Sequence, residues 1–115
     1  MAIGEAPVLE AITDLNAVSI ARSELDQARL VLVRTAALVA VDAPAASYLM
    51  HIGPAVEAGV TAAEIQDVLV TVAPIVGAPR VLTAARRITE ALGIAIAVVE
   101  QMADELEAED AAVAK

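Results

Sequence analysis

The sequence contains no cysteine, no tryptophan and no phenylalanine, and it has a single tyrosine and a single histidine. Without cysteine the chain cannot form disulfides, thiolate metal sites or iron–sulfur clusters, and it has no thiol nucleophile. One aromatic ring cannot form the stacking surface that binds single-stranded nucleic acid. One histidine with scattered acids gives no spaced set of metal ligands. The sequence therefore predicts neither a metal nor a cofactor.

A membrane-spanning run is also missing, although 59% of the residues are hydrophobic and the mean hydropathy is +0.73. The longest stretch without Asp, Glu, Lys or Arg, residues 43–56, contains two prolines, a glycine and the histidine, and it is shorter than the ~20 residues of a spanning helix. The N-terminus lacks the basic and apolar segments of a secretory signal. One domain of 115 residues cannot hide so much apolar surface as a monomer. We therefore expect a cytoplasmic homo-oligomer without a membrane partner.

Charge is concentrated at the two ends of the chain. Residues 1–28 hold five acids and one arginine, and residues 100–115 hold six acids and one lysine. Residues 29–99 hold five acids and five arginines, so the net charge of −9 comes from the two ends. Acidic ends keep an apolar assembly in solution and repel polyanions. No nucleic-acid partner is expected.

The apolar spacing is helical throughout and no segment alternates as a strand does, which predicts an all-α fold of about five to six helices. We expect an N-terminal arm over residues 1–24, a helical domain over residues 25–106 and a mobile acidic tail over residues 107–115. Gly93 is expected to act as a cap or hinge. The expected helices cover residues 25–41, 45–58, 61–77, 79–92 and 94–106.

Helix punctuation is clearest around the middle of the chain. Asp42 is expected to accept hydrogen bonds from the free amides of the helix that Pro44 opens. Gly59 predicts a left-handed cap at the end of that helix. Thr61 and Glu64 have the spacing of a capping box, which explains both residues without a function.

His51 is the main candidate for chemistry, because Ser47 and Tyr48 lie one turn before it on the same helix face. Pro54 removes the amide that would bond the Met50 carbonyl. That carbonyl is expected either to bond the His51 ring or to form part of a small polar pocket. His51 is thus either an acid–base residue or a core or interface histidine held by a carbonyl.

One order of residues carries a family resemblance: His51, Gly59 eight residues on, Thr61 and Glu64 opening a helix, then the Gly77-Ala78-Pro79 break. This order resembles the carboxymuconolactone decarboxylase family, whose fold is the alkylhydroperoxidase D-like helical bundle. The resemblance covers roughly residues 25–93. It implies a homotrimer or homohexamer, and it implies that His51 is a proton-transfer residue.

The sequence departs from both branches of that family. The redox branch places two cysteines where this chain has Pro44 and Ser47, and a thiol peroxidase cycle needs both thiols. Peroxidase activity is therefore not expected. The decarboxylase branch sets a carboxylate about one turn before the histidine, where this chain has Ala46 and Ser47. Ser47 is left to orient the ring or a water.

Two functions stay open on this basis. The first is a cofactor-independent acid–base enzyme acting on a small lactone or carboxylate, with His51 as the catalytic residue and Ser47 and Tyr48 lining the pocket. An anionic substrate would need cationic clamps, for which Arg34 and Arg80 are the candidates. Their alternative role is ion pairing within or between subunits. The second function is a non-catalytic oligomeric module that binds a small ligand at its subunit interfaces.

Overall fold

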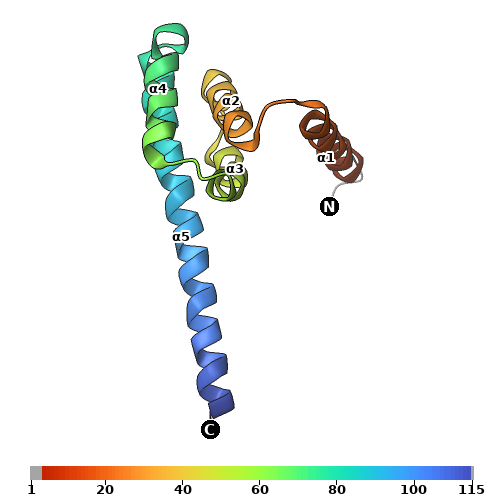
Figure 1. Ribbon diagram of the computed structural model, residues 1–115, viewed down its shortest axis with the longest axis vertical. Coiled ribbons are helices and arrows are strands. Elements are labelled where there is room, and N and C mark those ends of the chain that lie inside the picture. Colours follow the sequence, from red (N-terminus) through yellow and green to blue (C-terminus); the bar gives the residue numbers. More distant parts are fainter. Residues whose placement is uncertain (1–3, 115) are drawn as a thin grey trace.

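The computed structural model describes residues 4–114, and over that range it consists of helices without a strand (Figure 1). The all-α prediction is confirmed, and the number of helices falls within the expected range. The five helices are α1 (Glu5–Arg22), α2 (Gln27–Ala40), α3 (Ala45–Glu57), α4 (Ala62–Val76) and α5 (Ala78–Ala114).

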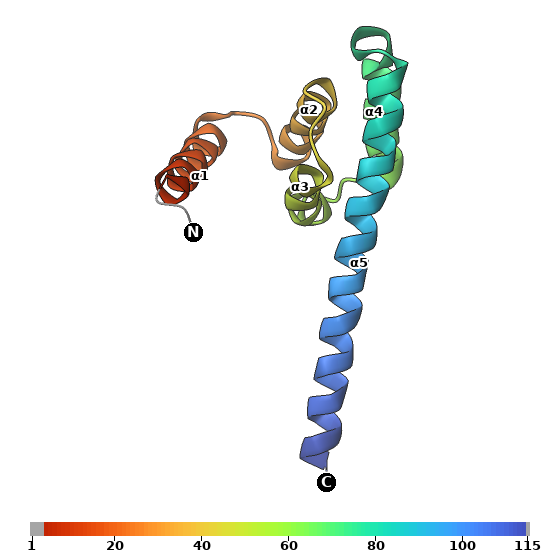
Figure 2. The same cartoon turned by 180° about the vertical axis from the view of Figure 1, so that it is seen from behind.

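Four helices form the core bundle, which we define as residues 27–92. Helix α3 packs against α2 and the first half of α5, while α4 packs against α2 and α5 (Figures 1 and 2). Apart from Tyr48, the centre consists of small and medium-sized side chains, which pack closely between the helices. The buried cluster contains Val39, Ala43, Tyr48, Leu69, Ala84 and Ala91.

Local signals explain where the helices of the core bundle begin and end. The side chains of Thr61 and Glu64 form the predicted capping box, with the Glu64 amide donating to Thr61 Oγ1 at 3.1 Å and the Thr61 amide donating to Glu64 Oε1 at 3.0 Å. Gly59 has the predicted left-handed conformation, with φ of 74°. The Val60 amide donates to the Ala55 carbonyl, as in a Schellman motif that closes α3. These predictions are confirmed.

Asp42 does not cap α3, contrary to expectation. It takes a left-handed conformation with φ of 57° just after α2, and its carboxylate accepts a hydrogen bond from Arg87 Nη1 at 2.9 Å. No side chain caps α3, whose N-cap position is held by Pro44. The prediction failed because Arg87, forty-five residues further along the chain, competes for the carboxylate.

Helix α5 is much longer than expected. It continues through Gly93 without a break and runs past residue 106 to Ala114, so the predicted hinge at Gly93 and the predicted end near residue 106 are wrong. One glycine costs a helix about 1 kcal/mol relative to alanine. The alanine-rich neighbours of Gly93 are good helix formers and offset that cost.

Two segments project from the core bundle, and we call them the arms: α1 and residues 93–114 of α5 (Figures 1 and 2). The radius of gyration is 17.4 Å, whereas a compact chain of this length has about 13 Å. Helix α1 contains no buried residue, and its backbone lies close to no other helix. The side chain of Arg34 on α2 reaches it with hydrogen bonds to Asn16 and Ser19. None of the helices between residues 4 and 114 has the length and hydropathy of a membrane-crossing segment.

Candidate functional site

A cavity of about 370 Å³, partly open to solvent, lies in the core bundle between α2, α3, α4 and the first half of α5. Its walls are mostly Val, Ile, Leu and Ala side chains, and no Asp, Glu, Lys or Arg lines it. This is the size and apolar character of a small-molecule site. The polar residues that line it are Thr35, Tyr48, His51, Thr61, Gln66 and Thr89.

His51 lines the cavity from the middle of α3 and is half-buried. Its Nδ1 lies 2.7 Å from the carbonyl oxygen of Ser47, one turn earlier. A carbonyl can only accept, so Nδ1 carries the hydrogen in this contact. In the neutral ring Nε2 is then unprotonated and free to accept a proton. The expected carbonyl partner is present, but it is that of Ser47 and not that of Met50.

Tyr48 lines the same cavity and is only 5% exposed. Its hydroxyl has no hydrogen-bond partner among the residues that the structure describes. Burial raises the pKa of the Tyr48 phenol above its ordinary value of 10.0, the Arg87 guanidinium lowers this pKa, and the Asp42 carboxylate raises it. The net direction is upward, so Tyr48 remains a neutral hydrogen-bond donor at physiological pH. A buried donor without a partner is rare in proteins.

Arg87 on α5 binds the turn between α2 and α3. Its Nη1 donates to the carbonyl oxygens of Asp42 and Ala43, each at 2.9 Å, and to the Asp42 carboxylate at the same distance. These contacts tie α5 to the turn between α2 and α3. Arg87 therefore supports the position of α3, which carries both Tyr48 and His51.

The structure separates the other predicted site residues from the cavity. Ser47 does not line it, and its backbone carbonyl holds the His51 ring instead. Arg34 donates to Asn16 and to Ser19 Oγ on α1. Arg80 donates to the carbonyl oxygen of Ala40, at the end of α2. Both guanidinium groups thus connect elements of the fold outside the cavity.

Sequence reasoning missed four polar residues of the cavity, among them Thr61, which it explained only as a helix cap. Thr35 on α2 uses its hydroxyl hydrogen for the Val31 carbonyl at 2.8 Å, and Thr89 on α5 donates to the Ala85 carbonyl at 2.9 Å. Gln66 on α4 is exposed but borders the cavity. Only the packing of four helices brings these residues together, so the spacing within any one segment does not predict that they line the cavity.

No three His, Asp or Glu side chains lie close enough to hold a metal ion in the part of the chain that the structure describes. In comparisons with known proteins, the model of the carboxymuconolactone decarboxylase family matches residues 6–91. Comparison with curated proteins and with solved structures gave no match. The family match covers α1 and the core bundle, and it ends where α5 leaves the bundle.

Proposed function

The chain belongs to the carboxymuconolactone decarboxylase family, and we propose that its cavity binds a small, largely apolar molecule with one carbonyl group, on which His51 acts as acid and base. The observation that carries this proposal is the pair formed by His51 and Tyr48 in one uncharged cavity. The first residue offers a proton acceptor and the second an unpartnered donor.

His51 supplies the proton transfer in this proposal. Because its Nδ1 hydrogen is held by the Ser47 carbonyl, the ring has a fixed orientation and its basic nitrogen is Nε2. An imidazole can act as both base and acid, so it can take a proton from a carbon next to a carbonyl group and return it elsewhere. A β,γ-unsaturated lactone would lose a proton from its α carbon and regain one at its γ carbon. The product is the α,β-unsaturated isomer, without any oxidant or reductant.

Tyr48 supplies the electrophilic contact. Its hydroxyl exposes almost no surface in the structure, so the ring would turn toward a bound ligand to donate to its carbonyl oxygen, which becomes more negative as the proton leaves carbon. Such a ligand would also satisfy a donor that is otherwise buried without a partner. The lining has no cation, so a lactone or ketone fits the cavity better than a free carboxylate, whose charge would be buried unpaired.

A binding function without catalysis is the second candidate, and one observation favours it. The partner of the His51 ring is a backbone carbonyl rather than a carboxylate, so nothing stabilises the imidazolium that a base would form. In this case the cavity would hold an apolar ligand and leave it unchanged.

Two measurements on the same protein distinguish the two candidates. Saturation-transfer NMR reports whether a five-membered β,γ-unsaturated lactone binds, and proton NMR in D₂O reports its isomerisation. We expect binding and turnover, with turnover lowered about 10²–10⁴-fold in His51→Gln and about 10²–10³-fold in Tyr48→Phe. Asp67→Asn, on an exposed side chain of α4, is the control and should change neither.

Binding without turnover would favour the second candidate. Absence of lactone binding would overturn the proposal that the cavity takes a neutral carbonyl compound. Turnover that persists in His51→Gln would remove His51 from the chemistry while leaving the binding site in place.

A further inference from the structure

Gly93 occupies an unexplained position in the middle of α5. It lies in a 37-residue helix, and glycine forms helices less well than alanine. Its backbone is helical, and a Cβ added to it would meet no atom within 4 Å. Nothing within the described chain therefore requires a glycine here. A missing side chain on an exposed helix face leaves room for another helix to approach closely.

The residues around Gly93 give this face a charge pattern. Arg86 and Glu100 lie seven residues before and after Gly93, and residues seven apart lie on the same face of a helix. Thr89 and Ala97, four residues before and after it, are also small. Arg86 and Glu100 are exposed, and neither forms an ion pair with any residue between 4 and 114. Glu90, one turn after Arg86, does not pair with it either among the described residues.

We propose that α5 pairs with α5 of a second copy of the chain in antiparallel orientation, across a twofold axis at Gly93. In that arrangement a residue n positions before Gly93 faces the residue n positions after it on the partner. Arg86 of each copy then faces Glu100 of the other, so the contact contains two equivalent ion pairs. The same register sets Thr89 against Ala97, which keeps the crossing point free of large side chains.

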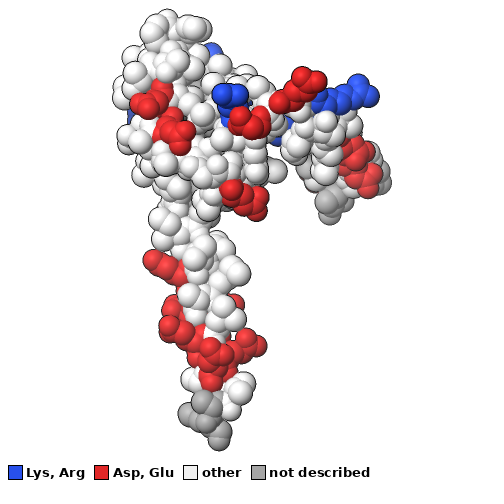
Figure 3. Space-filling view, viewed as in Figure 1, with Lys and Arg blue, Asp and Glu red and all other residues white. Residues whose placement is uncertain are grey.

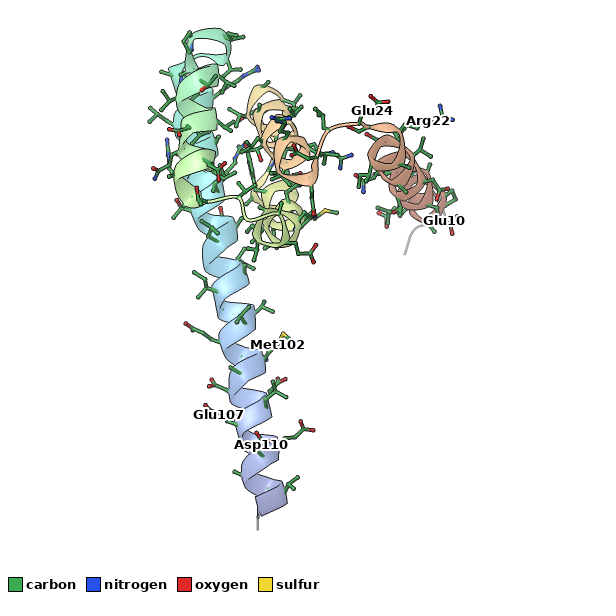
Figure 4. All side chains as sticks on the ribbon, in the orientation of Figure 1. Glu10, Arg22, Glu24, Met102, Glu107 and Asp110 are labelled. Atoms are coloured by element: carbon green, nitrogen blue, oxygen red, sulfur yellow. The ribbon has the colours of Figure 1, made fainter. Side chains whose placement is uncertain are left out.

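Charge selects the antiparallel orientation over the parallel one. The far end of α5 carries most of the acidic residues of this arm, as Figure 3 shows, and its labelled residues Met102, Glu107 and Asp110 stand clear of the core bundle in Figure 4. A parallel pair would place each of these acids beside its own copy, which is repulsive. An antiparallel pair sends the two acidic ends in opposite directions.

This interface goes beyond the proposed function and beyond the family match, which ends at residue 91. The glycine, Ala97 and Glu100 all follow that point. Thr89 lines the cavity, so the partner helix would border the proposed ligand site. Each copy would thus complete the rim of the other's cavity.

A charge exchange tests the pairing between Arg86 and Glu100. Sedimentation velocity over a range of concentrations should show that Arg86→Glu or Glu100→Arg weakens the association through α5 at least tenfold, and that the double variant restores it. Glu105→Arg makes the same charge change elsewhere on α5 and should leave the association intact. Failure of the double variant to recover would overturn the proposed register, as would single variants that associate like the unaltered protein.

Cysteine cross-linking tests the twofold axis directly, because the chain has no cysteine of its own. Gly93→Cys should give a disulfide-linked dimer with oxidised glutathione. Val113→Cys, on an 87% exposed side chain, should not, because antiparallel pairing separates the two copies of residue 113 by about 60 Å. Cross-linking at residue 113 would indicate parallel helices, and no cross-link at residue 93 would exclude the axis. Either result overturns the proposal.

Discussion

The core bundle and the arms are built from similar residues but bury them very differently. In the core bundle Val31 and Val39 are fully buried, because four helices surround them. In the arms residues of the same kind, such as Leu15 and Met102, are largely exposed. A helix can form its internal backbone hydrogen bonds and still leave its apolar side chains in water. Helix formation therefore does not require burial of the apolar side chains. Within one chain, the arms are helical but remain exposed.

The comparison also identifies where stability comes from. Most helical stability in proteins comes from tertiary packing, and α1 buries none of its residues within one chain. The arms also hold most of the net negative charge, which keeps apolar surface soluble without covering it. A second copy of the chain would give the arms the packing that they lack. The expectation of a homotrimer or homohexamer stays a prediction, and an isologous contact through α5 is one way to join smaller assemblies into larger ones.

The largest expected change is in the free energy of unfolding, and it comes from comparing a leucine of the core bundle with a leucine of an arm. Leu69 is 9% exposed and belongs to the central cluster, whereas Leu15 on α1 is 70% exposed. Leu69→Ala should lower the free energy of unfolding by about 2–5 kcal/mol, because it removes buried methyl groups and leaves a cavity. Leu15→Ala should change it by no more than about 0.5 kcal/mol.

Urea unfolding followed by circular dichroism, at a concentration where the protein is monomeric, measures both changes. Equal losses in the two variants would show that α1 is packed in the monomer, contrary to the structure. A loss in Leu15→Ala that grows with protein concentration would instead place α1 at a contact between copies.

The sequence predicted the helices of the core bundle well where local chemistry ends them. Thr61 with Glu64 begins a helix through side chain to backbone hydrogen bonds, and Gly59 ends one through its left-handed conformation. Both signals involve residues within a few positions of each other, so a sequence displays them. The prediction for α5 is wrong because Gly93 does not break the helix: its backbone stays helical and the alanines around it favour helix.

The candidate site could be predicted only in part, for the same reason. Tyr48 and His51 share one helix face by their spacing, and both line the cavity. Arg34 and Arg80 were selected by charge alone, and their partners on α1 and α2 lie far away in the sequence. Long-range partners follow from how helices pack, which no single segment specifies.

A smaller loss of stability is expected from replacing either of two arginines that connect helices. Arg87→Met should cost about 1–3 kcal/mol, because two carbonyls and a carboxylate at the α2–α3 turn lose their donor. Arg34→Met should cost less than about 1 kcal/mol, because its partners on α1 are exposed. Methionine keeps most of the apolar stem in both cases. Urea unfolding measures the losses, and a larger loss at Arg34 would mean that α1 belongs energetically to the core bundle.

The smallest expected effect on stability comes from the ionisation of Tyr48 at alkaline pH. Tyr48 is the only tyrosine of the chain, so its titration reports on the core bundle alone. Burial raises its pKa in the folded state above the ordinary 10.0, so the folded phenol keeps its proton where the unfolded one has lost it. The contribution of Tyr48 to the free energy of unfolding should therefore be constant below pH 10. It should fall as the pH rises from 10 toward the pKa of the folded state.

Ultraviolet absorbance of the phenolate measures this titration directly. The midpoint in native protein should lie above the midpoint in urea, and Tyr48→Phe should lose this part of the alkaline decline in stability. Leu69→Ala opens space in the cluster that contains Tyr48 and should move the native midpoint back toward 10.0, whereas Leu15→Ala should leave it unchanged. A shift of equal size in both variants would mean that the arm and the core bundle respond as one unit, and the distinction between them would then fail.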